Sequence, residues 1–363
     1  MTILIKPFKF LIILISIIIP IIKRRYVFSS CSENLSNDLF WFIENLIDDK
    51  NSEFIWLGCM QQNSKRIKSL DKKSFKAFLY LLTAEQVFFT HSLADLNNIY
   101  NLKSKRINLW HGCPIKRIGF DSLIFSSRRG YLRQFFRPEK FLWSTFFADA
   151  KIWEPIFMSA YGFDKSQIDL GGLPRSAYLK SFDTKKPDLT SNKLISFIPT
   201  YRNGITNYKA YDLILKSEAI QSLLNKNNIR LLVKLHPMDD YLFNQNEVIL
   251  CAKNDDVFEL MLKSKAVITD YSSLIFDFSI LCKPLILFMP DIDEFSKKIG
   301  GFYFNFPNAL DFEWIEKCYS EEGLLKSLES IISGNVKLPN ENFINKYNSF
   351  NATKYLINGK QDV

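Results

Sequence analysis

The chain has 363 residues, which is enough for two ordinary domains that each bury a core of their own. A hydrophobic content of 47% with 23% charged residues excludes an intrinsically disordered protein. The 47 Lys and Arg residues outnumber the 38 Asp and Glu residues, and the net charge of +9 favours an anionic partner such as a nucleotide, a phospholipid surface or nucleic acid.

Residues 10–22, FLIILISIIIPII, form an almost unbroken apolar run that basic residues 23–25 follow. A transmembrane helix needs about 20 residues, so the run is short for a full span. Three interpretations are open: an interfacial anchor or short signal-anchor, a buried first strand or helix, and a cleaved signal peptide. No small-residue cleavage site follows, and the heavier positive charge after the run favours membrane attachment from the cytosolic side.

From residue 26 onward, short apolar runs alternate with amphipathic ones. The apolar runs predict strands at 26–30, 53–58, 86–91 and 106–111. Helical spacing predicts helices at 37–48 and 73–85. This alternation is typical of a parallel sheet covered by helices.

The segment 122–160 interleaves Arg and Lys with large aromatic residues. One interpretation is a solvated helix face with core aromatics behind it. The other is an interfacial element, with aromatics at the lipid headgroups and cations toward anionic lipid. No nucleic-acid-binding motif accompanies the charge, so nucleic acid is not a predicted partner.

A polar stretch at 180–193 is the predicted linker, and the βαβ alternation restarts after it. Strands are predicted at 194–200, 229–236, 247–252, 266–270 and 284–290. Helices are predicted near 209–225, at 256–264 and from 271. Two similar halves predict an α/β protein of two doubly wound parallel-sheet domains facing a cleft.

His111 is one of only three histidines, and it stands between a strand-like lead-in and a Gly-Cys-Pro turn. It is a catalytic group on a loop, a metal ligand paired with Cys113, or a satisfied core histidine. A zinc site needs four ligands, and no second Cys or His pair accompanies these two, so no metal and no cofactor are predicted. The six cysteines, none in a CxxC pair, are expected to be reduced thiols.

A buried-type strand ends at Asp270, and a helix begins within the following Tyr-Ser-Ser. Asp270, Ser272 and Ser273 are natural N-cap residues, so helix capping alone explains them. The functional interpretation adds a phosphate, because ligands bind at the carboxyl ends of parallel strands and helix N-termini attract anions.

Two further strand ends carry cations. The strand at 229–236 ends in Lys234 and His236, which alternation places on one side of it. Each can donate a hydrogen bond to a phosphate oxygen, and a protonated histidine can assist a leaving group. A structural role for His236 is equally open. Arg202 follows the strand at 194–200 in the same way.

These stretches, in this order, resemble the CDP-glycerol glycerophosphotransferase family, whose members prime and polymerise teichoic acids and related capsular polyol-phosphate polymers. The resemblance covers residues 27–320. It is carried by WHGCPIKRIGFD (110–121), GGLPRSAYL (171–179), FIPTYRNG (197–204), VKLHP (233–237), the ITDYSS…FDF stretch within 256–295 and GGFYFNF (300–306).

The resemblance implies a GT-B-like fold, with a C-terminal domain that binds the CDP-activated polyol and an N-terminal domain that faces a lipid-linked acceptor. It implies that His111 is the general base and that His236 binds the donor pyrophosphate and stabilises the leaving group. The implied donor-phosphate loop contains Thr269, Asp270, Ser272 and Ser273. Lys234, Arg202 and Lys116 are weaker candidates for charge stabilisation, and Lys116 and Asp121 are candidates on the acceptor side.

The predicted organisation is a membrane-associating segment at 1–25, an acceptor-side domain at 26–182, a donor domain at 190–345 and a tail at 346–363. The expected activity is transfer of a polyol phosphate, above all glycerol phosphate, from a CDP-activated donor to a lipid-linked or polymer acceptor at the cytoplasmic membrane face, with release of CMP. One departure from the family is Ser176-Ala177 after the Pro-Arg of the GxPR turn, where a polar or acidic residue is common.

Two other functions are open. A GT-B glycosyltransferase that uses a nucleotide sugar for cell-surface polysaccharide synthesis would share the fold and the phosphate loop. A non-catalytic membrane-surface binding protein with degenerate domains is the second. The intact His111, His236 and Ser272 argue against it.

Overall fold

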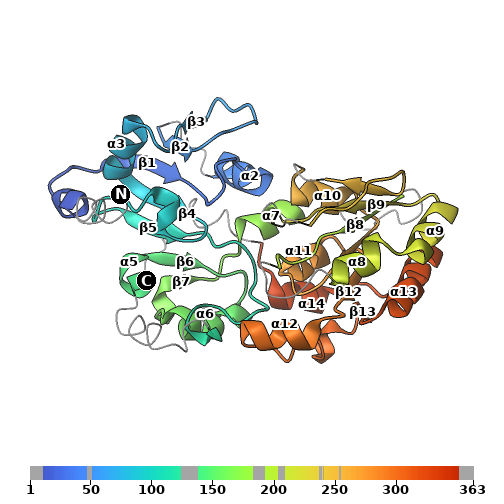
Figure 1. Ribbon diagram of the computed structural model, residues 1–363. Helices are drawn as coiled ribbons and strands as arrows, with labels where there is room; N and C mark the ends of the chain where they lie inside the picture. Colours follow the sequence, from blue (N-terminus) through green and yellow to red (C-terminus); the bar gives the residue numbers. More distant parts are fainter. Residues whose placement is uncertain are drawn as a thin grey trace. The chain divides into compact units, whose positions relative to one another are not determined.

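We describe the protein from a computed structural model (Figure 1). The structure describes residues 11–46, 51–123, 138–182, 193–202, 209–236, 239, 241–252 and 255–350. The chain divides into two compact units, the first of residues 1–112, 136–178 and 349–363 and the second of residues 113–135 and 179–348. It therefore passes between the units after residues 112, 135, 178 and 348, and the predicted linker at 180–193 lies within the second unit, just after the third of these passages.

The first unit contains a seven-stranded sheet of order β3-β2-β1-β4-β5-β6-β7, in which every neighbouring pair is parallel. Its strands are β1 (Ile22–Phe28), β2 (Glu53–Leu57), β3 (Ile67–Leu70), β4 (Ala84–Phe89), β5 (Lys105–Asn108), β6 (Thr145–Phe147) and β7 (Ile168–Asp169). Its helices are α2 (Asn37–Asn45), α3 (Phe75–Thr83), α5 (Pro138–Leu142), α6 (Glu154–Tyr161) and α7 (Pro174–Lys180), whose last two residues belong to the second unit.

Aromatic side chains fill the core of this unit. Phe28 of β1 and Phe88 of β4 are fully buried and stack with ring centroids 4.4 Å apart. Val27 and Val87, on the opposite face of the same two strands, are also fully buried. Burial of both faces is what a central parallel pair requires, and it explains why the buried ends of these strands, at 26–28 and 87–89, are continuous apolar runs.

The second unit contains a six-stranded parallel sheet of order β10-β9-β8-β11-β12-β13. Its strands are β8 (Leu194–Phe197), β9 (Arg230–Val233), β10 (Ile249–Cys251), β11 (Ala266–Thr269), β12 (Leu285–Phe288) and β13 (Glu316–Cys318). Its other helices are α8 (Lys209–Leu215), α9 (Glu218–Lys226), α10 (Val257–Lys263), α11 (Leu274–Ile280), α12 (Ile292–Ile299), α13 (Glu321–Ser333) and α14 (Glu341–Tyr347). Apolar residues of α8, α9 and α13 share one core with the strands.

The prediction of two parallel-sheet α/β domains is confirmed, but one predicted helix was wrong. The helix expected near 209–225 is two helices, α8 and α9. Ser217 starts the second one, because its hydroxyl accepts a hydrogen bond from the Ile220 N–H at 3.1 Å. The same hydroxyl donates to Glu321 of α13, so a tertiary contact selects the break.

All nine predicted strands end one to three residues earlier than expected, and two of these ends bear directly on candidate site residues. β5 ends at Asn108 and β9 at Val233, so residues 109–111 and 234–236 lie in the loops that follow. The expectation that strand alternation orients Lys234 and His236 was therefore wrong. The short strands β3, β6, β7 and β13 were not predicted, because two to four residues show too little periodicity.

The N-terminal apolar run is helical at residues 11–15 and leads into β1 at Ile22. Five of its apolar side chains, those of Leu11, Leu14, Ile15, Ile17 and Ile18, are 45–81% exposed. A buried first helix is therefore wrong for this stretch. Within the described ranges, no helix combines the length and the apolar character that crossing a bilayer requires.

We predict that Phe88→Ala lowers the free energy of unfolding of the first unit by about 3–5 kcal/mol, because it leaves a cavity against Phe28. Five of the six tryptophans belong to this unit, so denaturant unfolding followed by tryptophan fluorescence reports on it. Leu242→Ala is the control, because this side chain is 90% exposed and should change stability by less than about 0.5 kcal/mol. Equal effects of the two substitutions would contradict the described core.

Candidate active site

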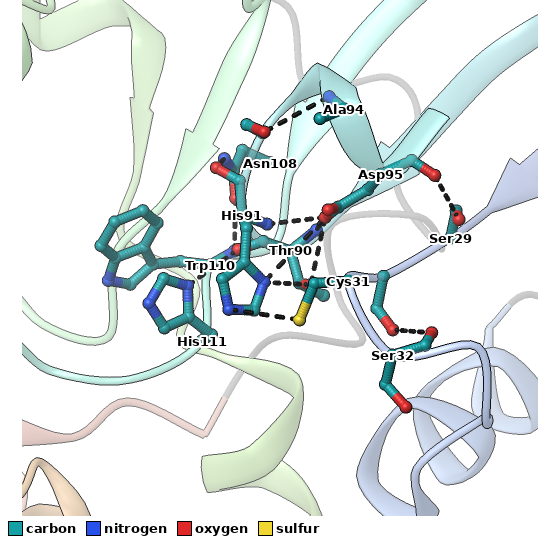
Figure 2. Close-up of polar contacts among 12 residues, drawn as sticks. Ser29, Cys31, Ser32, Thr90, His91, Ala94, Asp95, Asn108, Trp110 and His111 are labelled. Atoms are coloured by element: carbon teal, nitrogen blue, oxygen red, sulfur yellow. Dashed lines mark hydrogen bonds and ion pairs between the residues drawn. The ribbon is translucent and has the colours of Figure 1, made fainter. Parts of the chain in front are cut away.

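Three loops of the first unit bring a cluster of polar side chains to one edge of its sheet (Figure 2). Cys31 follows β1, His91 follows β4 and His111 follows β5. These strands are adjacent and parallel, so their carboxyl ends lie at the same edge. The strand order reverses between β1 and β4, and such reversals are where open α/β sheets bind ligands. The cluster is therefore the candidate site of this unit.

His111 lies on the loop after β5 with its side chain exposed. Its Nδ1 is 3.0 Å from the backbone carbonyl oxygen of Thr90. A carbonyl oxygen only accepts hydrogen bonds, so Nδ1 carries the proton and Nε2 keeps its lone pair. An exposed imidazole in this tautomer can take a proton from a substrate hydroxyl.

The backbone around His111 is held in an uncommon conformation. Trp110 has a φ of 55°, and Gly112 has a φ of 141°, which only glycine adopts readily. The Trp110 N–H donates to Asn108 Oδ1 at 2.7 Å, and the Arg175 guanidinium donates to the His111 carbonyl. Backbone strain that surrounding contacts maintain is common at functional sites.

A buried carboxylate holds the loop after β4. Asp95 is 4% exposed, and its Oδ2 accepts hydrogen bonds from the N–H groups of Thr90 at 3.1 Å and His91 at 2.9 Å. The Ser29 hydroxyl donates to the Asp95 carbonyl at 2.6 Å, and Asn108 Nδ2 donates to the His91 carbonyl at 3.3 Å. The loop after β4 is thereby tied to those after β1 and β5.

His91 is the side chain that the sequence analysis missed. Its ring stacks on that of His111, with centroids 3.9 Å apart and an interplanar angle of 2°. Residues 86–91 were predicted to be a strand, but β4 ends at Phe89 and leaves His91 in the loop. One signal was available: in a chain with three histidines, His91 and His111 each follow an apolar strand.

The GxPR turn supports the same loops. Gly172 has a φ of 103°, and a Cβ there would lie 2.3 Å from the carbonyl oxygen of Ser349, so only glycine fits. The buried Asp149 accepts hydrogen bonds from the Ser176 hydroxyl at 2.6 Å and the Leu173 N–H at 3.2 Å. Ser176, noted as a departure from the family, is thus the partner of a buried carboxylate.

The second unit repeats the arrangement at the reversal between β8 and β11. Arg202 follows β8, His236 follows β9, Asp270 follows β11 and Asp291 follows β12. These four strands are consecutive neighbours in the sheet. Their carboxyl ends therefore collect the charged groups that lie far apart in the sequence.

Arg202 is completely buried and lies at the centre of this second cluster. Its Nη2 is 2.7 Å from Asp270 Oδ2 and 3.6 Å from Asp291 Oδ1. Burial by itself would lower the pKa of Arg202, but the two carboxylates outweigh it and the net shift is upward. Tyr271 donates to Asp291 at 2.8 Å, which orients that carboxylate. The sequence analysis did not single out Asp291 or Tyr271.

The residues of the predicted phosphate loop separate into buried and accessible ones. The Thr269 hydroxyl donates to the Ile198 carbonyl at 2.6 Å, and Asp270 Oδ1 accepts from the N–H groups of Thr200 and Tyr271. Asp270 is therefore not the N-cap of α11. Ser272 and Ser273 are only partly buried, and Ser273 occupies the N-cap position without a side-chain hydrogen bond to the helix.

Lys116 and Asp121, predicted on the acceptor side, belong to the second unit. Lys116 forms a backbone bridge with Phe302, and the Tyr303 hydroxyl donates to Asp121 at 2.6 Å. Burial lowers the pKa of Lys116, Asp270 raises it and Arg202 lowers it, for a net shift downward. Lys116 thus lies in the field of the same cluster.

Lys234 and His236 lie in the loop after β9. Burial is the main cause that lowers the pKa of each. For His236, Asp239 opposes the shift, while Lys234 and Lys116 add to it. The His236 ring stacks on Tyr201 with centroids 4.5 Å apart. The free protein therefore holds His236 neutral at neutral pH.

Several predicted features lie partly outside the described residues. These parts are residues 1–10 of the membrane-associating segment, 124–137 of the basic-aromatic segment, 183–192 of the linker, 203–204 of FIPTYRNG, Pro237 of KLHP and 351–363 of the tail. Among the residues that the structure describes, no three His, Cys, Asp or Glu side chains are placed to hold a metal ion.

The chain matches the family model described as CDP-Glycerol:Poly(glycerophosphate) glycerophosphotransferase over residues 11–354. A teichoic acid poly(glycerol phosphate) polymerase of Bacillus spizizenii is 26% identical over 344 residues, covering 86% of this chain and 83% of that protein. A teichoic acid glycerol-phosphate transferase of Staphylococcus aureus is 24% identical over 317 residues, covering 79% of this chain and 78% of that protein.

Solved structures share the fold. A variant of the wall teichoic acid polymerase TagF matches with a TM-score of 0.71 at 22% identity, over 93% of this chain and 88% of that one. The same polymerase soaked with CDPG matches with a TM-score of 0.69, over 93% and 87% of the two chains.

We predict that Asp270→Ala lowers the free energy of unfolding of the second unit by about 3–5 kcal/mol, because Arg202 loses its nearest counter-charge while buried. Hydrogen exchange of the β8 and β11 amides measures the loss. Glu294→Ala is the control, because it breaks an exposed ion pair with Lys298 and should cost less than about 1 kcal/mol. If Asp270→Ala costs no more than the control, Arg202 does not depend on this carboxylate.

Proposed function

The chain belongs to the CDP-Glycerol:Poly(glycerophosphate) glycerophosphotransferase family, and we propose that it transfers glycerol phosphate from CDP-glycerol to a hydroxyl of a lipid-linked or polymer acceptor, releasing CMP. The product is a polymer of the teichoic-acid or capsular class. Within this family match, one observation carries the proposal: an exposed histidine, His111, keeps an Nε2 lone pair at a strand-order reversal.

In the proposed reaction, the acceptor hydroxyl oxygen attacks the β-phosphorus of CDP-glycerol. The phosphoanhydride bond to the α-phosphate breaks, and CMP leaves with the bridging oxygen. The hydroxyl proton moves to Nε2 of His111, and a phosphodiester forms. A positioned base of this kind contributes about 10²–10⁴-fold, and the remaining work is orientation and charge stabilisation.

Burial separates the candidate donor residues into two roles. Thr269, Arg202 and Asp270 are buried, and their polar groups contact other protein groups, so we assign them to holding the loops. The proposed contacts with the donor pyrophosphate are the accessible or half-buried side chains of Lys116, Lys234, His236, Ser272 and Ser273. Asp121 accepts a hydrogen bond from the Tyr303 hydroxyl, and we propose that it influences the site by orienting Tyr303.

His236 is proposed to donate a hydrogen bond to the pyrophosphate. Its ring is neutral in the free protein because burial and the neighbouring lysines lower its pKa. A bound pyrophosphate brings negative charge close to the ring and raises that pKa. His236 can then stabilise the charge that develops on the leaving CMP.

The two units are proposed to act as a GT-B-like pair, with the second binding the donor and the first supplying the base. The WHGCPIK motif joins them, because His111 belongs to the first unit and Lys116 to the second.

We propose that the protein works at the cytoplasmic face of the membrane and that residues 11–18 contact the lipid. The exposed apolar side chains of this stretch support the proposal. The basic residues after it contribute less, because Lys23 and Arg25 form ion pairs with Glu85 and Glu53.

The base assignment predicts that His111→Asn lowers kcat for CMP release from CDP-glycerol by at least about 100-fold, because no group remains to accept the proton. The affinity for CDP-glycerol, measured by calorimetry, should stay unchanged, because the proposed donor contacts lie in the second unit. His236→Asn is the matched variant, and it should weaken donor binding as well. A His111→Asn enzyme with normal turnover would remove His111 from the mechanism.

The donor is tested with purified wild-type protein, an acceptor of membrane-bound glycerol-phosphate oligomer, and a panel of CDP-glycerol, CDP-ribitol and nucleotide sugars. Release of CMP with addition of one glycerol phosphate to the acceptor, seen by mass spectrometry, supports the proposal. Release of a nucleoside diphosphate from a nucleotide sugar would instead indicate a glycosyltransferase. Donor binding without turnover would indicate a binding protein.

The membrane proposal predicts that the double substitution Ile17→Asp and Ile18→Asp lowers binding to phosphatidylglycerol vesicles at least about tenfold, because a fully buried isoleucine contributes about 1.5–3 kcal/mol. Cosedimentation measures the binding. Leu242→Asp is the control, because it places a carboxylate at an apolar side chain of the second unit that is 90% exposed. Equal binding of the double variant and the wild type would show that residues 11–18 do not hold the protein on lipid.

A further inference from the structure

The rings of His91 and His111 lie beside each other (Figure 2). Their centroids are 3.9 Å apart and their planes differ by 2°. We propose that His91 is a positioning residue, whose ring holds the His111 imidazole in the orientation and tautomer that let Nε2 take the acceptor proton. The inference rests on the proposed function, in which His111 is the base.

One two-residue stretch supplies two restraints on the His111 ring. The Thr90 carbonyl accepts the Nδ1 proton at 3.0 Å, and the adjacent His91 provides the stacking face. The stretch is itself rigidly held, because the buried Asp95 accepts the N–H groups of both residues. The orientation of the base is therefore set from the end of β4, although the base lies after β5.

The His91 ring is fixed at both of its nitrogens. Its Nδ1 is 2.9 Å from the Thr90 hydroxyl, and its Nε2 is 3.6 Å from the sulfur of Cys31 (Figure 2). One proton assignment satisfies all contacts with a neutral ring. The Cys31 thiol donates to Nε2, Nδ1–H donates to the Thr90 hydroxyl, and that hydroxyl donates to Asp95 at 3.4 Å. The ring therefore cannot turn away from His111 without breaking these contacts.

The surroundings of His91 favour its neutral form. Burial lowers the pKa of His91, the carboxylate of Asp95 raises it, and Arg175 lowers it, so that the net shift is downward. When His111 takes the acceptor proton, its imidazolium lies on the face of a neutral aromatic ring, which is a favourable cation–π contact. A protonated His91 would place a second positive charge against it and oppose the transfer.

This role predicts a loss in kcat alone. His91 contacts His111, Thr90 and Cys31, whereas the proposed donor residues belong to the second unit. A misoriented base slows the proton transfer without changing donor affinity. Small displacements of a catalytic group cost up to about 100-fold in rate.

The test compares His91→Phe with His91→Leu, since both fill the site but only phenylalanine presents a flat ring. We expect His91→Leu to lower kcat by about 10- to 100-fold with an unchanged KM for CDP-glycerol, and His91→Phe to stay within about threefold of wild type. The acid limb of the wild-type pH–rate profile should be steeper than that of His91→Phe, because only the wild type can gain a second proton at the stack.

The second readout needs no activity. Nitrogen-15 spectra of the donor-free protein should show His111 in a single Nδ1–H tautomer in the wild type and in His91→Phe, and averaged tautomers in His91→Leu. Wild-type kcat in His91→Leu, or equal losses in both variants, would overturn the proposal. If tryptophan fluorescence shows that His91→Leu unfolds at a lower temperature than the wild type, His91→Asn is tested instead, with the same expected loss of kcat. A wild-type protein without transfer activity would contradict the proposed function. The nitrogen-15 spectra would still show whether the His91 ring fixes the His111 tautomer.

Discussion

Parallel strand pairing is the constraint on which both candidate sites depend. In each unit all strands of the sheet run in one direction, so every loop that leaves a carboxyl end lies at the same edge. The strand order reverses once in each sheet, between β1 and β4 and between β8 and β11, and the flanking connections depart to opposite sides. Cys31, His91 and His111 in one unit and Arg202 and Asp270 in the other meet at these reversals for that reason.

Buried aspartates hold the loops at these edges. Asp95 accepts hydrogen bonds from N–H groups of the loop after β4. Asp149 accepts those of Leu173 in the GxPR turn and of Ser349, and Asp270 accepts those of Thr200 and Tyr271. A buried carboxylate is costly unless hydrogen bonds or a counter-charge satisfy it, so each of these loops is confined to the geometry that supplies them. The residues that face substrate in the proposed reaction are thereby carried on loops with little freedom.

This separation of buried residues that hold the loops from residues that face substrate suits phosphoryl transfer. That reaction depends more on correctly positioned charges than on covalent chemistry by the protein. The first unit contains a histidine whose Nδ1 donates to a backbone carbonyl, and the second contains the cations Lys116, Arg202 and Lys234 and two partly buried serines. Arg202 is the least accessible of these cations, and its complete burial between two carboxylates makes it a support for the site. The WHGCPIK motif contributes His111 to one unit and Lys116 to the other, which explains why a single short motif matters to both.

The sequence by itself determined the βαβ order, the two parallel-sheet domains and the family, because apolar periodicity and motif order are local properties of the chain. From the same motifs it predicted His111, His236 and Asp270 as site residues. It did not reveal the stack of His91 on His111, the ion pair of Arg202 with Asp291, or the early ends of β5 and β9. These depend on which strands are neighbours and on contacts between residues far apart in the chain. Tertiary structure alone decided them, because strand order is selected by the packing of whole layers and leaves no mark in any one segment.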